Sequence, residues 1–171
     1  MLISDTNKTY IIEETSNSFT IERNNDQQHY EVLESINSLS NDSFCVLNHL
    51  FVNGGNEEVF ESRFLKRNQH LQDVPGFKAL RFLRPVVKGR HYIIITLWNS
   101  RQAFYDWQNS QAYAQTHKKR GTQKGVDHRI VNRDLSYNIR IELESLNKIL
   151  WMLLMNCTHV KVYLTCSNNI R

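Results

Sequence analysis

Cysteine is scarce in this 171-residue chain. It has three cysteines, Cys45, Cys157 and Cys166, and no two of them are spaced as Cys-x-x-Cys. An odd and sparse set of cysteines argues against a disulfide framework. It fits a protein of the reducing cytoplasm, which is where we expect this one to work.

Long apolar runs are also missing. A membrane-spanning helix needs about 18 apolar residues, whereas the run from Ile149 to Met155 has seven. The N-terminal sequence MLISDTNKTY has no basic start followed by an apolar stretch, so it does not predict a secretion signal. No repeat or low-complexity tract is present. The 40% hydrophobic and 11% aromatic content instead indicates a globular protein with a real core.

Acidic residues are unevenly spread along the chain, although the net charge is only +4. Residues 1–50 carry two Lys or Arg against eight Asp or Glu, whereas residues 51–144 carry sixteen against nine. Residues 145–171 carry three basic residues and no acid. The middle segment is therefore the part most suited to an anionic partner such as a nucleic acid, a phosphate or a ligand with carboxylates.

The apolar pattern predicts the order β-α-β-β-α-β over residues 43–144. Strands are expected at 43–52, 77–85, 91–98 and 136–144, helices at 56–71 and 99–110, and a second helical stretch at 111–121. The strand at 77–85 alternates apolar and basic residues and is expected to be half exposed. The order is ferredoxin-like, which means an α+β fold with an antiparallel sheet and helices on one face. The other face then needs a cover from a partner, another domain or a ligand.

The two ends of the chain differ from this central domain. Residues 1–42 are expected to form a partial N-terminal half, with a strand hairpin in KTYIIEETSNSFTIER and a short amphipathic helix in QHYEVLESINSL. Residues 145–171 form an atypical C-terminal tail that contains the strand-like segment HVKVYLTC.

Three residues of the central domain are candidates for a functional site. His117 precedes the basic run Lys118–Arg120, and a neutral imidazole can bind a transition metal, including haem iron. Trp107 follows an aromatic stretch at the end of a predicted helix. Asn48 interrupts the apolar strand CVLNHL, and an amide buried there needs hydrogen-bond partners. Taken singly, each residue has an ordinary structural explanation.

Taken together, the segments VLNHLFV and TLWNSRQAFYDWQNSQAYAQTHKKRG resemble the IsdG-type haem-degrading monooxygenases of the antibiotic biosynthesis monooxygenase superfamily. The likeness is greatest to the longer HmoB-type members. It is dense over 43–144, weaker over 9–42 and absent from 145 onward. The resemblance implies a dimeric α/β-barrel fold in which an N-terminal half imitates a second subunit, so that either a monomer or a homodimer is expected. It also implies a further strand and helix ahead of residue 1.

The resemblance implies a function and a role for each candidate residue. His117 matches the axial ligand of the haem iron, Asn48 the distal amide that hydrogen-bonds dioxygen, and Trp107 the indole that ruffles the porphyrin. The expected enzyme binds haem as substrate and cofactor, cleaves it with O2 and electrons from a reductase or a small-molecule reductant, and releases iron. Nearby Lys and Arg side chains are expected to receive the propionates.

Three alternatives remain at this stage. One is a non-catalytic signalling protein of the TRAP type, which shares the two-half architecture. Another is a cofactor-free quinol monooxygenase, which would explain a Trp and an Asn but not an axial His beside a basic cluster. The third, an RNA-binding domain, is disfavoured because the basic-Gly-aromatic signature of that fold is absent, so no nucleic-acid partner is expected.

Overall fold

A computed structural model describes residues 2–5, 8–15, 18–23, 25–67, 71–111, 113–114, 128–143 and 165–166. The elements in chain order are β1 (Leu2–Asp5), β2 (Lys8–Glu14), β3 (Phe19–Arg23), β4 (Asp26–Ile36), β5 (Ser43–Val52), α1 (Glu57–Arg67), the 3-10 turn η1 (Leu71–Asp73), β6 (Phe77–Pro85), β7 (Tyr92–Trp98), α2 (Arg101–Gln108), β8 (Val131–Leu143) and β9 (Thr165–Cys166). Over these ranges one sheet runs in the order β1-β2-β3-β4-β6-β7-β5-β8, and β9 pairs with β2.

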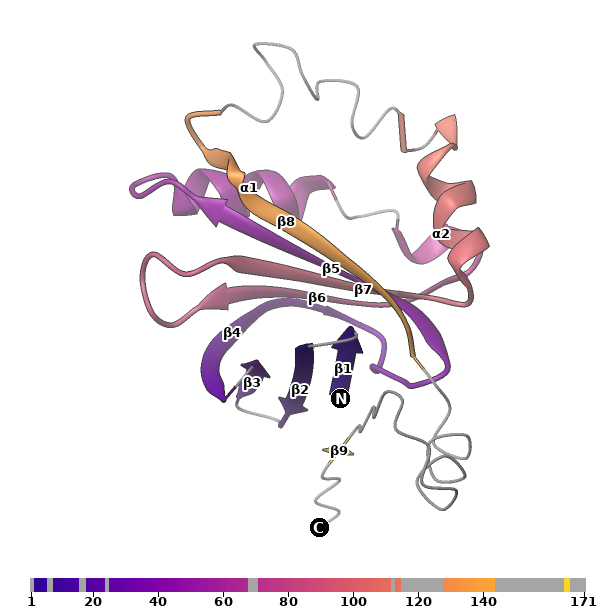
Figure 1. Ribbon diagram of the computed structural model, residues 1–171. Coiled ribbons are helices and arrows are strands. Elements are labelled where there is room, and N and C mark those ends of the chain that lie inside the picture. The colour runs from indigo at the N-terminus through magenta and orange to yellow at the C-terminus, as the bar shows by residue number, and fades with distance from the viewer. Residues whose placement is uncertain are drawn as a thin grey trace.

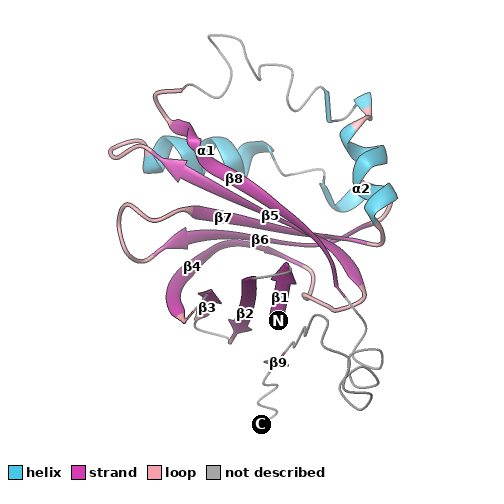
Figure 2. Ribbon diagram, in the orientation of Figure 1, coloured by secondary structure: helices cyan, strands magenta, loops and turns pink. Residues whose placement is uncertain are grey.

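The C-terminal half confirms the predicted ferredoxin-like order. Strands β6, β7, β5 and β8 pair antiparallel with their neighbours. Both helices lie on the same side of these strands (Figure 2). β8 begins at Val131, five residues earlier than expected, because Val131 and Asn132 pair with the end of β5 although the polar segment that follows gives no strand pattern.

The helices begin where their sequences favour a helix start and bury aromatic residues on the sheet. Glu57 and Glu58 occupy the first turn of α1, where the helix dipole favours negative charge. Phe60 and Phe64 of this helix pack against Phe82, with ring centroids 5.8 and 4.1 Å away. α1 ends before the predicted limit at residue 71, and Leu71 instead packs on the same core from η1.

The N-terminal half contains strands where a helix was expected. The hairpin is confirmed by β2 and β3, but the helix predicted in QHYEVLESINSL is wrong, because these residues lie in β4. One edge of β4 pairs with β3 and the other with β6, so it joins the two halves into one sheet. Hydrogen bonding along both edges outweighs the helix-like spacing of its apolar residues.

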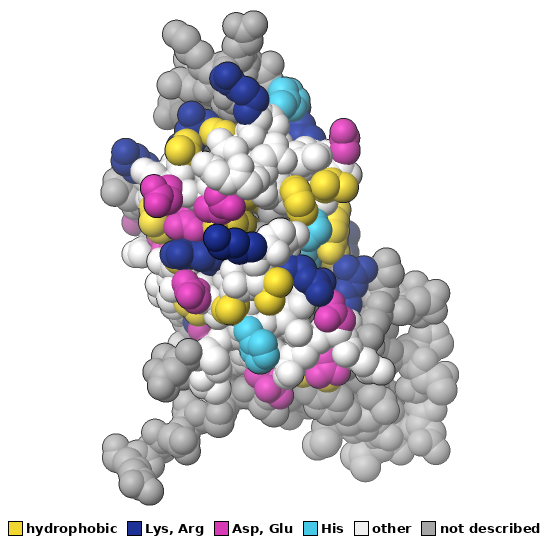
Figure 3. Space-filling model, turned by 90° about the vertical axis from the view of Figure 1, so that its left-hand side faces the viewer, with side chains coloured by type: hydrophobic (Ala, Val, Ile, Leu, Met, Phe, Trp, Pro, Cys, Tyr) yellow, Lys and Arg dark blue, Asp and Glu magenta, His cyan; other side chains and the backbone are white. Residues whose placement is uncertain are grey.

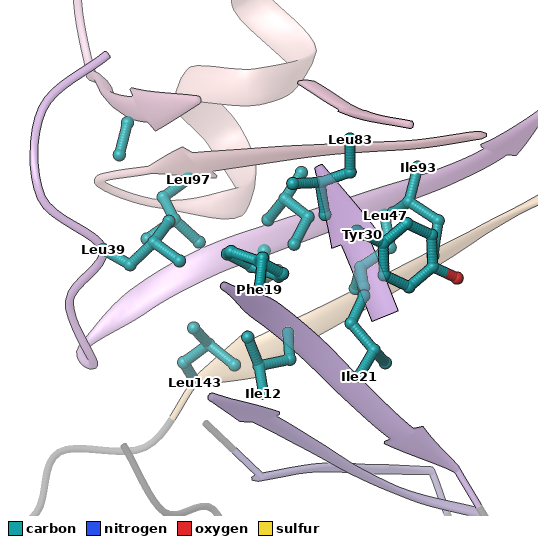
Figure 4. Close-up of a cluster of buried hydrophobic side chains, with 13 residues drawn as sticks. Ile12, Phe19, Ile21, Tyr30, Leu39, Leu47, Leu83, Ile93, Leu97 and Leu143 are labelled. Atoms are coloured by element: carbon teal, nitrogen blue, oxygen red, sulfur yellow. The ribbon is translucent and has the colours of Figure 1, made fainter. Parts of the chain in front are cut away.

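The N-terminal strands supply the cover that the second sheet face needs. β1 to β4 curl beneath the sheet on the side away from the helices (Figure 1), and β1 also contacts β8 at the other edge of the sheet. Phe19 and Ile12 of this half meet Leu47 and Leu83 of the central strands in a shared core (Figure 4). The result is a barrel-like sheet with an apolar interior and both helices outside.

A buried ion pair crosses this interior. Arg81 of β6 is 4% exposed and donates from Nη2 to Glu14 of β2 at 3.1 Å, while its Nη1 donates to the backbone oxygen of Asn37 at 2.7 Å. The expectation that residues 77–85 form a half-exposed strand is therefore wrong. N-terminal strands cover the face that alternation alone assigned to solvent.

Gly76 fixes the approach of α2 to the sheet. Its φ of +79° lies in the left-handed region, and a Cβ added there would stand 2.5 Å from the Cβ of Ala103 in α2. Gly76→Ala is expected to lower the free energy of unfolding by about 2–4 kcal/mol, from backbone strain and overpacking. Gly89→Ala is the control for urea denaturation, because Gly89 has a φ of +78° but no atom within 4 Å of an added Cβ. An equal loss in both variants would contradict the packing argument.

Two predicted segments fall largely outside the described residues. Gln111, Tyr113 and Ala114 are helical, as expected for the start of 111–121, but the rest of that stretch is not described. Within the predicted tail at 145–171, only β9 is described, and it pairs in parallel with Glu13 and Glu14 of β2. No helix in the described part of the chain is long and apolar enough to cross a membrane.

Candidate functional site

Asn48 lies on the sheet face that the helices cover. It stands between Ile94 of β7 and Asn138 of β8 in the strand ladder, and its neighbours on the same face, Val46 and Leu50, are apolar. Its side chain is half-buried, and the amide makes no hydrogen bond to any residue that the structure describes. A half-buried amide on an otherwise apolar face is available to a ligand.

Trp107 reaches the same face from the last turn of α2. Its ring lies 4.9 Å from that of Trp98, which is fully buried at the end of β7, and 4.8 Å from that of Tyr113. Trp98 is fixed in turn, because its Nε1 donates to Oγ1 of Thr96 at 3.0 Å. The half-buried indole therefore rests on a rigid aromatic base and belongs to the cluster that includes Val46.

An N-terminal cap and an aromatic anchor hold α2 in place. The Ser100 side chain accepts a hydrogen bond from the backbone N–H of Ala103 at 3.1 Å, which caps the helix N-terminus. Phe104 anchors the middle of the helix, with its ring 5.6 Å from those of Phe44 and Trp98. These contacts set the position of the Trp107 side chain relative to β5.

Arg140 of β8 adds positive charge beside these residues, and sequence reasoning missed it. It pairs with Val46 in the ladder, on the Asn48 face, and its guanidinium lies 5.2 Å from the Phe104 ring centroid. Its Nη1 also lies 3.4 Å from the hydroxyl of Tyr105. The alternation of Asn138, Arg140 and Glu142 in β8 was the available signal.

The structure brings two of the three predicted site residues to one face. Asn48 lies on the helix-covered face of β5, and Trp107 packs with Val46 on that face, whereas His117 and the run Lys118–Arg120 lie outside the described residues. No group of three or more His, Cys, Asp or Glu that could hold a metal ion occurs in the described ranges. A metal held through a porphyrin needs only one protein ligand, so such a cluster is not required for the expected chemistry.

The opposite face of β5 carries a second polar group that the sequence did not reveal. His49 is buried inside the barrel, and its ring stacks on that of Tyr137 with centroids 4.5 Å apart. Burial, with smaller contributions from the charges of His91 and Arg23, lowers the pKa of His49 to about 3. The imidazole is therefore neutral in the folded protein at neutral pH.

The lowered pKa makes stability depend on pH. His49 in the unfolded chain takes up a proton below pH 6.5, whereas folded His49 does not until about pH 3, so acid favours unfolding. The wild type is expected to lose about 2 kcal/mol more than His49→Gln when the pH falls from 7 to 5. Urea denaturation at both pH values measures this difference, with His128→Gln, at an exposed histidine, as the control. Parallel losses in all three proteins would show that His49 does not titrate in this way.

Comparison with known proteins places the site in context. Residues 43–119 match the family model described as antibiotic biosynthesis monooxygenase. A relative named heme oxygenase (mycobilin-producing), from Mycobacterium tuberculosis, is 35% identical over 68 residues, which cover 40% of this chain and 65% of that protein. The signal transduction protein TRAP of Staphylococcus aureus is 32% identical over 87 residues, covering 49% of this chain and 50% of that protein.

Similarity at the level of structure extends further along the chain. A solved structure described as a major regulator of staphylococcal pathogenesis aligns with this chain at a TM-score of 0.66. The alignment covers 85% of this chain and 84% of the chain in that structure. Its sequence identity is 20%, so the likeness concerns the fold. The aligned regions span only 65% and 50% of the two curated relatives, so their activities do not transfer to this chain without a test.

Proposed function

We propose that this chain, whose residues 43–119 match the antibiotic biosynthesis monooxygenase family model, is a haem-degrading monooxygenase. The observation that carries the proposal is the Asn48 amide, which has no hydrogen bond to any described residue and lies on the apolar sheet face on which Trp107 packs with Val46. The relative named heme oxygenase, at 35% identity within this domain, supports it.

The residues present suit a flat, apolar ligand with two carboxylates. Val46 and Ile94 give the sheet face an apolar floor, and the Trp107 and Phe104 rings of α2 rise at its side. Arg140 stands beside the Phe104 ring, where its guanidinium can pair with a propionate. These residues therefore suit haem in polarity and charge.

Each residue has a separate part in the proposed site. His117 would hold the haem iron, Asn48 would offer an amide N–H donor from the sheet, and Trp107 would pack its indole against the ring. Haem, when bound, supplies the iron that activates O2 and the ring that is opened. The residues bind, orient and distort the haem, and because it is consumed, haem is both substrate and cofactor. A cytoplasmic reductase or small-molecule reductant provides electrons, and iron is released.

Haem titration tests this proposal. Hemin added to the purified protein should give a saturable shift of the Soret absorption band, and His117→Ala should lose it. His128→Ala is the matched control, because it removes an exposed histidine away from the site. Ascorbate in air, with catalase to remove free peroxide, should then bleach the band in the wild type. Binding without bleaching would leave a haem-binding protein and refute the enzyme.

A second candidate has its own support. The alignment with the staphylococcal regulator covers 85% of this chain, and the TRAP relative matches 49% of it, so a non-catalytic signalling protein is the alternative. The same titration separates the two functions. A chain that gives no Soret shift at any hemin concentration, in either the wild type or His117→Ala, would favour the signalling role.

A further inference from the structure

A small cavity opens at one end of the barrel, on the sheet face opposite to Asn48. Its volume is about 50 Å³, and both halves of the chain line it. Arg23 of β3 and Gln28 of β4 come from the N-terminal half, and His49 and Tyr137 come from β5 and β8. Figure 3 views this end of the molecule and shows Lys, Arg and His side chains near its centre, with Asp and Glu side chains among them.

Cationic and hydrogen-bonding side chains line the cavity together with Ile21 and Ile93. Two guanidiniums (Arg23 and Arg90) and two imidazoles (His49 and His91) face it, and none of its described lining residues is an Asp or Glu. Asp26 is the carboxylate at its rim, 3.3 Å from Nη1 of Arg90. One acid against two arginines leaves the local charge positive, which favours an anionic ligand.

Fixed contacts orient the donors around this space. Nη1 of Arg23 donates to the hydroxyl oxygen of Tyr137 at 2.9 Å, and a guanidinium with five N–H groups can hold a tyrosine and an anion together. The Tyr137 hydroxyl accepts that bond, so its own hydrogen can point to a ligand. His91 Nε2 lies 2.8 Å from the backbone oxygen of Leu135, which assigns the N–H to that nitrogen.

The volume of the cavity and its access to solvent limit the size of the ligand that it can bind. A cavity of about 50 Å³ exceeds the ~10–15 Å³ that one water molecule needs but is far too small for haem. Arg90 and Tyr137 at the rim are exposed, whereas His49 at the base is 5% exposed, so a ligand can enter from solvent and reach a dry end. We infer that this pocket binds a phosphate-sized oxyanion, independently of the haem site.

Calorimetry with inorganic phosphate tests the inference. The full chain is titrated at an ionic strength held constant with sodium chloride, and saturable binding is expected. Arg23→Gln and Arg90→Gln should each weaken binding by about tenfold or more, because each removes a charge-assisted hydrogen bond. Arg101→Gln removes the same charge from α2, on the opposite sheet face, and should bind phosphate like the wild type.

A parallel titration distinguishes a free phosphate ion from a phosphate ester, and a spectroscopic control checks that each variant is folded. Glycerol phosphate is titrated in parallel: tighter binding than inorganic phosphate would identify a phosphate ester, and weaker binding the free anion. Circular dichroism checks that each variant is folded, and Tyr137→Phe, at an exposed residue, serves if Arg23→Gln unfolds. Absence of saturable binding, or equal weakening by Arg101→Gln, would overturn the inference.

Discussion

Asn48→Leu is expected to bind haem as the wild type does and to open the ring at least ~10²-fold more slowly. Loss of one well-placed hydrogen-bond donor typically costs that factor when charge develops on the group it faces. Leucine has a similar size and fits the apolar neighbours Val46 and Leu50, and the amide makes no hydrogen bond within the described chain. The substitution should therefore leave folding intact, which separates a role in catalysis from one in stability.

Asn138→Leu is the control for this experiment. Asn138 lies directly opposite Asn48 in the ladder between β5 and β8 and is exposed, so it offers the same chemical change one strand away. Rates of haem loss are measured with ascorbate in air for both variants. A similar slowing in both, or loss of haem binding in Asn48→Leu alone, would contradict the proposed role of the Asn48 amide.

Arg81→Met is expected to lower the free energy of unfolding by about 3–5 kcal/mol, because it breaks a buried ion pair. The Glu14 carboxylate is left without its guanidinium, and the backbone oxygens of Ile36 and Asn37 lose a donor inside the barrel. Methionine keeps the length and apolar stem of the arginine, so cavity formation contributes little. Urea denaturation gives the value directly.

Two further variants isolate the electrostatic cause. Arg101→Met breaks the pair with Glu142, in which both side chains are more than half exposed, and should cost no more than about 1 kcal/mol. Arg81→Met combined with Glu14→Gln should recover part of the loss, since no unpaired charge is then buried. If the double variant is as unstable as the sum of the single variants, the loss comes from packing and not from charge.

The central domain was predictable because its local patterns agree with its tertiary surroundings. The strand at 43–52 and the helix that begins at 101 have sequences that indicate the same structure at every level. β4 was not predictable: Tyr30, Leu33 and Ile36 are spaced as on a helix, and only pairing with both β3 and β6 makes them a strand. Local sequence does not contain that long-range pairing.

The candidate site was predictable in part for a similar reason. Alternation along β5 placed Asn48 with Val46 and Leu50, and the aromatic run placed Trp107 at the end of a helix, as the structure has them; that the helix packs on the Asn48 face came from the structure alone. Arg81 and His49 were not recognised as buried, because the strands that cover them come from the N-terminal half. The role of His117 remains a prediction, since it lies outside the described residues.

The most direct test of the central claim is mass spectrometry of the haem after reaction with ascorbate and isotopically labelled dioxygen, in the presence of catalase. The proposed activity predicts that hemin bound to the wild type becomes a ring-opened tetrapyrrole carrying labelled oxygen, and that a ferrous chelator captures the released iron. Hemin recovered intact and unlabelled from a fully loaded protein would contradict the account.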